Sequence, residues 1–257
     1  MRGRRSWSNL KIEIHDRLPA MIETIPEYGA NPHEREKQAA ARRSLVYVRD
    51  GHVVGLGTGS TASYAIRFLG EMVRAGLKIL AIPTSVNSRD LAVSVGIPLT
   101  TFEDCPIIDV TIDGADEVSP ALELIKGGGG ALLREKIVAS ASRKIVIVAD
   151  STKQVRVLGK YPLPVEVVPF AEALLTERIA SLGASVALRR DPAGRPLITE
   201  EGHHILDCSF GQILDPVRLA NDLKHMPGVV EHGLFLDLAD VALIGRDSEV
   251  LELHRPL

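Results

Sequence analysis

Short apolar runs alternate with amphipathic segments through the first part of the chain. Each run is short and continuous, which predicts a buried strand. Strands are predicted at 52–56, 77–82, 98–100, 107–112 and 144–149. Helices are predicted between them at 34–49, 62–72, 87–95 and 131–141. Apolar strands that alternate with helices are typical of a parallel sheet covered on both faces. The pattern therefore predicts an α/β fold with a Rossmann-like sheet.

The pattern changes at about residue 160. The elements expected there, in chain order, are a strand at 163–168, a helix at 170–182, strands at 184–190 and 204–210, a helix at 216–226 and a strand at 229–236. This β-α-β-β-α-β order is that of a ferredoxin-like unit. A last apolar run at 239–244 is expected to return to the first sheet.

Two domains and an extension follow from these patterns. We expect residues 31–158 and 237–257 to form a Rossmann-like domain that carries the site, and residues 159–236 to form a smaller ferredoxin-like domain. Residues 1–30 contain Pro19 and Pro26 and show little periodicity, so we interpret them as a poorly ordered N-terminal extension. A proline-rich segment without periodicity is typical of a loop.

Unusual polar loops follow three of the predicted strands. They are residues 57–61, 113–116 and 150–153, and a run of four glycines at 127–130 can join them if its loop folds to the same edge. In parallel sheets the functional site lies outside the carboxyl ends of the strands. The convergence of these loops is the main indication of a site.

The loop from Gly57 to Thr61 indicates an anion site. Thr58, Gly59, Ser60 and Thr61 stand where a strand meets a helix, and helix N-termini bind phosphate through backbone N–H groups. The loop has neither the Walker lysine nor the third glycine of a dinucleotide fingerprint. A monophosphate therefore fits better than a nucleotide, and a simple capped turn is the alternative.

Two carboxylates, Asp113 and Asp116, flank Gly114 and Ala115 at a strand end. Carboxylates so close in sequence can bind a metal, bind sugar hydroxyls or transfer protons. An Asx turn with a helix cap is the structural alternative. Glu117, the next residue, is expected to be solvated.

Lys126 and Glu135 bracket the glycine run. The glycines cost conformational entropy, so they indicate a close approach of the backbone to something else. Lys126 precedes Gly127, Gly128 and Gly129 and can neutralise a developing oxyanion. Glu135 follows one turn into the next helix and can act as an acid or base; a solvated surface glutamate is the alternative.

A lysine and a pair of histidines are further candidates for the site. Lys153, after a strand end, can contact phosphate or be a surface lysine. His203 and His204 are adjacent in a predicted strand, where successive side chains face opposite ways, so they are not expected to bind one metal ion.

Composition narrows the class of protein. The chain has 257 residues with 45% hydrophobic residues and a formal net charge of −3, which favours neither nucleic acid nor an anionic membrane as a partner. No apolar stretch is long enough for a membrane span. Cys105 and Cys208 form no disulfide or metal pattern, so a cytoplasmic location is expected.

At these residues the chain resembles the ribose-5-phosphate isomerases of the A type. The matching segments are 55–62, 113–117, 126–139, 149–153, 158–167, 227–230 and 239–245. The resemblance implies interconversion of D-ribose 5-phosphate and D-ribulose 5-phosphate, without metal or cofactor, by a homodimer or homotetramer in the pentose phosphate pathway.

The resemblance also implies roles for individual residues. Glu135 resembles the general base that moves a proton between C1 and C2 through an enediolate. Asp113, Asp116 and Lys126 resemble the groups that open the sugar ring and stabilise charge on O1 and O2. Matching substrate-binding positions are Thr58, Gly59, Ser60, Thr61, Gly114, Ala115, Gly127, Gly128, Gly129, Lys153 and, less closely, Lys37.

Two other functions remain as alternatives. A non-catalytic sugar-phosphate sensor would need a DNA-binding segment, which residues 1–33 are too short to provide, and it has no need of Glu135. A nucleotide-dependent dehydrogenase or kinase lacks its sequence fingerprint here.

Overall fold

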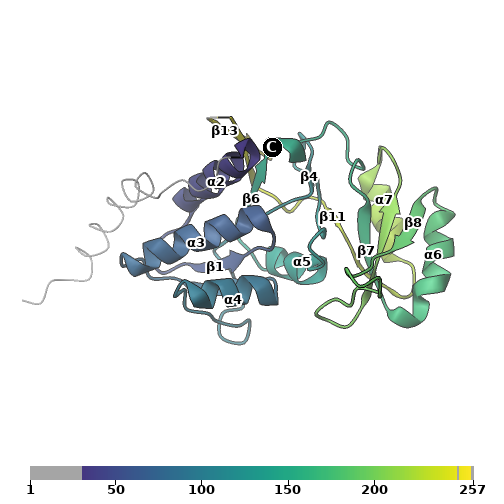
Figure 1. Cartoon of the computed structure of the whole chain (residues 1–257), viewed down its shortest axis with the longest axis horizontal. Helices are drawn as coiled ribbons and strands as arrows, with labels where there is room; N and C mark the ends of the chain where they lie inside the picture. Colours follow the sequence, from purple (N-terminus) through teal and green to yellow (C-terminus); the bar gives the residue numbers. More distant parts are fainter. Residues whose placement is uncertain (1–30, 248, 256–257) are drawn as a thin grey trace, which may run out of the picture.

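The computed structural model describes residues 31–247 and 249–255, and the predicted N-terminal extension lies outside them (Figure 1). Within these residues, no helix combines the length and apolar character that a membrane crossing needs.

A six-stranded sheet forms the larger part of the molecule. Its order is β13-β12-β6-β3-β1-β2, in which all neighbouring pairs are parallel except the antiparallel pair of β12 and β13. The strands are β1 (Val53–Leu56), β2 (Leu80–Pro83), β3 (Val110–Asp113), β6 (Ile145–Asp150), β12 (Val241–Arg246) and β13 (Glu249–His254). The predicted α/β class is confirmed.

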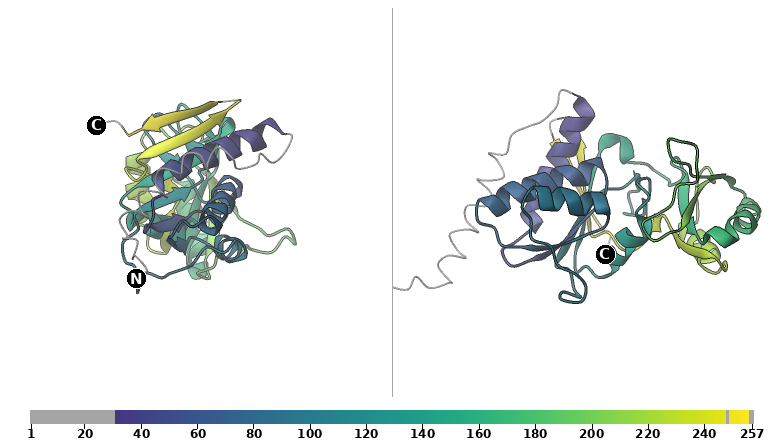
Figure 2. Two further views of the ribbon diagram at one scale, coloured as in Figure 1. Left: turned by 90° about the vertical axis from the view of Figure 1, so that its left-hand side faces the viewer. Right: turned by 60° about the horizontal axis from the view of Figure 1, so that its bottom comes forward.

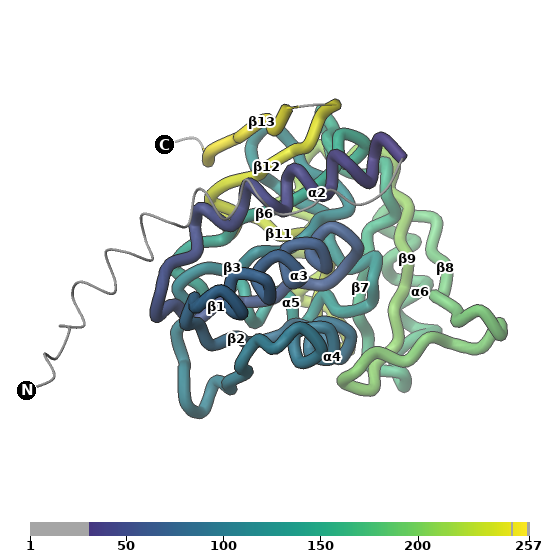
Figure 3. Tube along the Cα trace, turned by 60° about the vertical axis from the view of Figure 1, so that its left-hand side comes forward, coloured from purple at the N-terminus to yellow at the C-terminus, as the bar shows by residue number. Residues whose placement is uncertain are grey.

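Helices cover both faces of this sheet. They are α2 (Pro32–Ser44), α3 (Ser60–Arg74), α4 (Val86–Ser94) and α5 (Leu132–Ser140). Helices α2, α3 and α4 lie side by side on one face, and α2 runs along β12 (Figures 2 and 3). Alternate residues of β6 enter two different cores: Val146 and Val148 pack with these helices, whereas Ile147 packs with Ala139 of α5. This explains why the parallel strands read as continuous apolar runs.

A four-stranded antiparallel sheet forms the smaller part. Its order is β10-β7-β9-β8, and a separate apolar core lies between this sheet and two helices. Its elements are β7 (Leu163–Val167), α6 (Glu172–Ala180), β8 (Ser185–Leu188), β9 (His204–Ser209), α7 (Pro216–Lys224) and β10 (Val229–His232). The β-α-β-β-α-β order is the one predicted from the sequence.

Two strand predictions were wrong, and three strands were missed: the edge strand β13 and two short strands at 117–118 and 124–125. The strand expected at 98–100 is a single bridge between Ala81 and Leu99. The run 229–236 divides at Gly233 into β10 and β11 (Leu234–Phe235). The antiparallel edge strand β13 was not predicted at all, because only its pairing with β12 makes residues 249–254 a strand.

The break at Gly233 places β11 in a third sheet. This sheet has the order β11-β5-β4, with β4 (Glu117–Val118) and β5 (Leu124–Ile125), and it lies between the two larger sheets (Figure 1). A Cβ at Gly233 would stand 2.3 Å from the Lys126 carbonyl oxygen, so only glycine allows this approach. The Lys126 N–H donates to the Gly233 carbonyl oxygen at 2.9 Å. The small sheet therefore holds Lys126 in place.

Glu117 was expected to be solvated, and this was wrong. Its carboxylate is buried and accepts hydrogen bonds from the backbone N–H groups of Gly159 and Tyr161. Those two donors come from more than forty positions further along the chain. Glu117 thus ties β4 to the segment that leads into the four-stranded sheet.

Candidate active site

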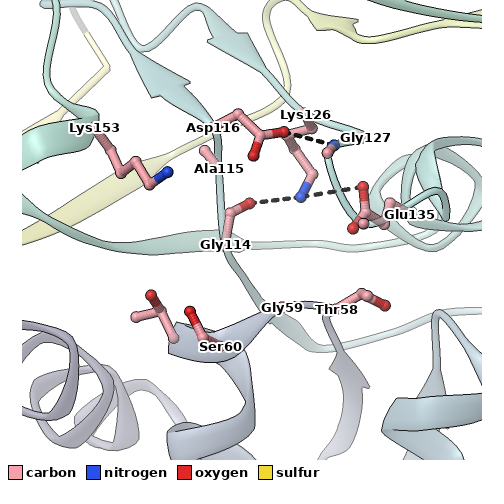
Figure 4. Close-up of a pocket in the computed structure, with 13 residues that line it drawn as sticks. Thr58, Gly59, Ser60, Gly114, Ala115, Asp116, Lys126, Gly127, Glu135 and Lys153 are labelled. Atoms are coloured by element: carbon pink, nitrogen blue, oxygen red, sulfur yellow. Dashed lines mark hydrogen bonds and ion pairs between the residues drawn. The ribbon is translucent and has the colours of Figure 1, made fainter. Parts of the chain in front are cut away.

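The predicted loops meet at one cavity of about 460 Å³, its open mouth included, beside the carboxyl ends of β1, β3 and β6. Figure 4 shows the side chains that face it. The lining residues are Thr58, Gly59, Ser60, Thr61, Gly114, Ala115, Asp116, Lys126, Gly127, Gly128, Gly129, Glu135 and Lys153.

The loop from Gly57 to Thr61 forms one wall. Gly57 packs against Asp113 so closely that a Cβ would stand 2.1 Å from the carboxylate Oδ1. Gly59 has a φ of 112°, which favours glycine, and α3 starts at the next residue. The loop therefore presents Ser60 and Thr61, with the N-terminus of α3, to the cavity, which is a favourable position for an anion.

The hydroxyl of Thr58 is engaged within the protein. Its Oγ1 lies 2.7 Å from both Thr84 Oγ1 and Ser85 Oγ, at the end of β2. The backbone N–H of Thr58 donates to Asp113 Oδ1 at 3.1 Å. The structure thus uses the Thr58 hydroxyl to fix the loop.

Lys126 stands at the centre of a buried charged cluster. Its Nζ lies 3.0 Å from Asp113 Oδ2. It also lies 3.4 Å from Glu135 Oε2 and donates to the Gly114 carbonyl oxygen at 2.5 Å (Figure 4). All three side chains are at most 4% exposed. Burial acts to lower the pKa of Lys126, but Asp113 and Glu135 together raise it, so the ammonium is charged.

Glu135 has an unusual carboxylate. Burial raises its pKa to about 8, against the opposing effect of the Lys126 ammonium. Among the described residues, its Oε2 has no hydrogen-bond donor with good geometry. A carboxyl group with a pKa near neutrality and an oxygen without a hydrogen bond, at a cavity wall, is suited to exchange protons with a bound molecule.

Asp113 is buried beside Glu135 but differs in its hydrogen bonds. Burial raises the pKa of Asp113 as well, whereas Lys126 and the backbone N–H groups of Gly114 and Thr58 lower it. These donors stabilise the ionised form. We therefore assign the negative charge that balances Lys126 to Asp113, which leaves the proton on Glu135 in the free protein.

Asp116 fixes the glycine run. Its Oδ2 accepts a hydrogen bond from the Gly128 N–H at 2.7 Å. A Cβ at Gly128 would stand 2.5 Å from Asp116 Oδ1 and 2.8 Å from the Tyr161 hydroxyl. Asp116 thus brings the glycine backbone to the cavity wall opposite the loop at 58–61 (Figure 4).

Lys153 reaches the cavity from a short 3₁₀ turn after β6. Glu36 of α2 holds this turn, because its Oε2 accepts from the Ser151 N–H at 3.2 Å and the Ser151 hydroxyl at 2.8 Å. His33, Glu36 and Asp150 approach one another closely enough to hold a metal ion. Glu36 already accepts these bonds and one from His33, so the cluster is explained by the hydrogen bonds that attach α2 to this turn.

The remaining predicted residues lie elsewhere. Lys37 forms an ion pair with Glu34 at 2.7 Å and is not among the residues that line the cavity. The ring Nδ1 of His203 lies 3.0 Å from Glu166, and that of His204 lies 2.6 Å from Glu172. The two histidines therefore have separate partners, as their strand position predicted.

Sequence reasoning missed Arg189, which follows β8 in the smaller sheet. Its Nη1 donates to the carbonyl oxygens of Gly127 at 2.7 Å and Gly128 at 3.2 Å. Arg189 and Arg190 end the predicted strand 184–190, where two adjacent arginines are typical of solvated side chains, so the sequence offered no signal for this contact.

Fold and cavity together define a class: α/β proteins whose strand-end loops form a small polar cavity around a buried lysine and two carboxylates. Residues 80–249 match the family model of ribose 5-phosphate isomerase A (phosphoriboisomerase A). The chain belongs to this family, as its motifs predicted.

Individual relatives agree over nearly their whole length. The chain is 49% identical to ribose-5-phosphate isomerase A of Parvibaculum lavamentivorans, over 83% of this chain and 95% of the relative. It is 52% identical to that of Nitrobacter hamburgensis, over 85% and 97%.

Solved structures of the family share the fold. A D-ribose-5-phosphate isomerase in complex with phospho-erythronic acid is 39% identical and superimposes with a TM-score of 0.85, covering 88% of this chain and all of that one. Ribose 5-phosphate isomerase A of Methanocaldococcus jannaschii is 40% identical with a TM-score of 0.82, covering 86% and 99%.

Proposed function

We propose that this protein interconverts D-ribose 5-phosphate and D-ribulose 5-phosphate. The observation that carries the proposal is the position of Glu135 in the wall of the cavity. Its Oε2, which has no hydrogen bond, lies 3.4 Å from the Lys126 ammonium. The family relatives bear the name of this activity, and one is described with a phosphorylated acid bound.

In the proposed reaction Glu135 is the general base. The ionised carboxylate removes the proton from C2 of the open-chain aldose, and the electron pair of the C–H bond forms the C1–C2 double bond of an enediolate. Charge on O1 is stabilised by Lys126, which is already in place and needs no reorganisation. A proton passes from O2 to O1, and Glu135 returns its proton to C1 to give the ketose.

Other residues bind and orient the sugar. We propose that Ser60, Thr61 and the N-terminus of α3 bind the phosphate together with Lys153, and that Asp113 and Asp116 act on the hydroxyls and assist ring opening. Gly127, Gly128 and Gly129 bring backbone to the reacting end. Phosphate binding fixes the geometry of the sugar and so contributes to the rate of the chemical step.

The direct test is an assay of the wild-type protein with ribose 5-phosphate in the presence of EDTA, coupled to detection of the ketose. We expect turnover that EDTA leaves unchanged, because the proposed groups need no metal. Inhibition by EDTA that a divalent ion relieves would instead favour a metal at Asp113 and Asp116. Binding of the sugar phosphate without turnover would favour the sensor.

We expect kcat/KM to depend on the protonation of Glu135. The carboxylate must be ionised to remove the C2 proton, and its pKa in the free protein is about 8. Therefore kcat/KM should fall by about sixteenfold in total as the pH decreases from 8 to 6.5, with most of this fall above pH 7, where a phosphate with pKa near 6 is mainly dianionic. Initial rates at low substrate across this range measure it. A flat profile would contradict the assignment of the base.

We also propose a homodimer or homotetramer in the cytoplasm. Phe170 is fully exposed and Leu174, one helical turn away, is 51% exposed, which is apolar surface that a second copy would cover. Cys105 and Cys208 are both free, as expected in a reducing compartment. Light scattering gives the mass relative to the 27.8 kDa chain.

A further inference from the structure

The glycine run is held from the smaller sheet by one side chain. Arg189 follows β8 and donates through Nη1 to the carbonyl oxygens of Gly127 and Gly128. These two residues lie more than sixty positions earlier in the chain and line the cavity. Arg189 thus connects the smaller domain to the glycine run through its guanidinium group.

Arg189 is itself fixed in direction. Its Nε donates to Asp207 Oδ2 at 2.9 Å, and its Nη2 contacts Asp207 Oδ1, so the carboxylate holds the guanidinium at two points. Asp207 lies in the middle of β9. The side chain of Arg189 is only 12% exposed. Bidentate arginine–carboxylate pairs of this kind fix geometry as well as contributing energy.

The peptide between Gly127 and Gly128 is held at both ends. Its carbonyl oxygen accepts from Arg189, and its N–H donates to Asp116 Oδ2 at 2.7 Å. Because a peptide unit is planar and its C=O and N–H point in opposite directions, two such partners prevent the plane from rotating. The same carbonyl oxygen also accepts from the Gly130 N–H at 3.0 Å, which closes the turn before α5.

This restraint is needed because of the sequence. Four consecutive glycines have more conformational freedom than any other tetrapeptide, and Gly127 and Gly130 adopt positive φ angles of 104° and 84°. The turn joins Lys126 to the helix that carries Glu135. A change in the turn would therefore alter the position of Lys126 relative to the carboxylate.

We propose that Arg189 is a positioning residue of the active site, which fixes the glycine turn and through it the geometry of Lys126 and Glu135. The inference rests on the proposed isomerase function for its kinetic consequences. It assigns to the smaller sheet a part in catalysis, because Asp207 and Arg189 add a restraint from that sheet to the bonds that Asp116 and the Gly130 N–H make with the turn.

The kinetic test compares Arg189→Met and Arg189→Lys with Arg190→Met. Arg190 is the matched control, since it is the next residue and donates to a glycine carbonyl oxygen, that of Gly194, away from the cavity. We expect Arg189→Met to lower kcat by about 10²-fold, the loss typical of a misplacement of about 1 Å. KM should change by less than about threefold, because the phosphate contacts come from the opposite wall and remain. Arg189→Lys should lose less, and Arg190→Met should match wild type.

A second measurement does not depend on activity. Hydrogen–deuterium exchange, followed by mass spectrometry of the peptide that contains residues 127–130, reports on the Gly128 and Gly130 N–H groups, which are bonded in the structure. We expect faster exchange there in both Arg189 variants, with peptides of α3 and α4 unchanged, and wild-type exchange in Arg190→Met.

The outcomes separate the two proposals. If the wild-type protein has no isomerase activity, the proposed function is wrong, and the exchange experiment still decides whether Arg189 fixes the turn. If Arg189→Lys exchanges and turns over like wild type, the positioning role is wrong. If Arg189→Met raises exchange throughout the molecule and Arg189→Lys changes nothing at the turn, Arg189 has only a general structural role and the inference is overturned.

Discussion

Replacing Glu135 by glutamine is expected to lower kcat by about 10³-fold while the fold and substrate binding are kept, since a positioned general base contributes about 10²–10⁴-fold. Glutamine has almost the same shape and can occupy the same buried position, but it cannot accept the C2 proton. The measurement is kcat and KM for ribose 5-phosphate. Turnover near the wild-type rate would show that another group is the base.

The same substitution has an expected effect on stability, whose sign follows from the pKa. The folded-state pKa of Glu135 is about 8, against an ordinary value of 4.5, so the folded protein retains a proton that the unfolded chain releases between these pH values. The free energy of unfolding therefore decreases as the pH rises from 4.5 to 8. Glu135→Gln removes this dependence and should be more stable than wild type above pH 8.

A matched control for Glu135→Gln is Glu166→Gln. Glu166 is equally buried, but it lies in β7 of the smaller sheet and bonds Thr199 and His203. It should change stability without a comparable loss of kcat. Denaturant unfolding at pH 6 and pH 8.5 measures the stability difference, and a destabilised Glu135→Gln at pH 8.5 would contradict the raised pKa.

Replacing Lys126 by methionine is expected to have the largest combined effect. The substitution removes the cation that would stabilise the enediolate, which should lower kcat by about 10²–10³-fold. It also leaves Asp113 and Glu135 buried without a counter-charge, and breaking a buried pair in this way costs about 3–5 kcal/mol. The loss of stability should be greater at pH 8.5 than at pH 5.5, because both carboxyls take up protons more readily at the lower pH.

Two comparisons test this explanation. Lys126 Nζ lies over the Phe235 ring, 5.4 Å from its centroid, and the partly buried Lys136 lies over the same ring with Nζ at 4.7 Å. Lys136→Met removes this second lysine, whose partners are Glu231 and His232. It should lose stability without the same fall in kcat. In the double variant Lys126→Met with Glu135→Gln, one buried carboxyl is gone, so part of the lost stability should return. If the two single effects simply add, the groups do not interact as the structure indicates.

Much of the fold could be read from local pattern. The apolar runs at 144–149 and 163–168 became β6 and β7 with ends shifted by one residue, because burial on both faces or in a small core leaves a strong signal in the sequence. The strand β13 and the bridge at Leu99 were mispredicted because pairing with a distant partner, rather than local propensity, decides them.

For the candidate site, too, some features could be predicted from local sequence and others could not. The sequence by itself determined which residues are proposed to carry the chemistry, since glycines that must approach closely and polar residues at strand ends leave a local signature; Gly57, Asp113 and the glycine run are examples. Only the tertiary structure decided how those groups behave. Glu135 has a raised pKa because distant segments exclude water from it, and Arg189 reaches the glycine turn across more than sixty residues. Burial and electrostatics depend on which segments meet, which no local pattern in the chain records.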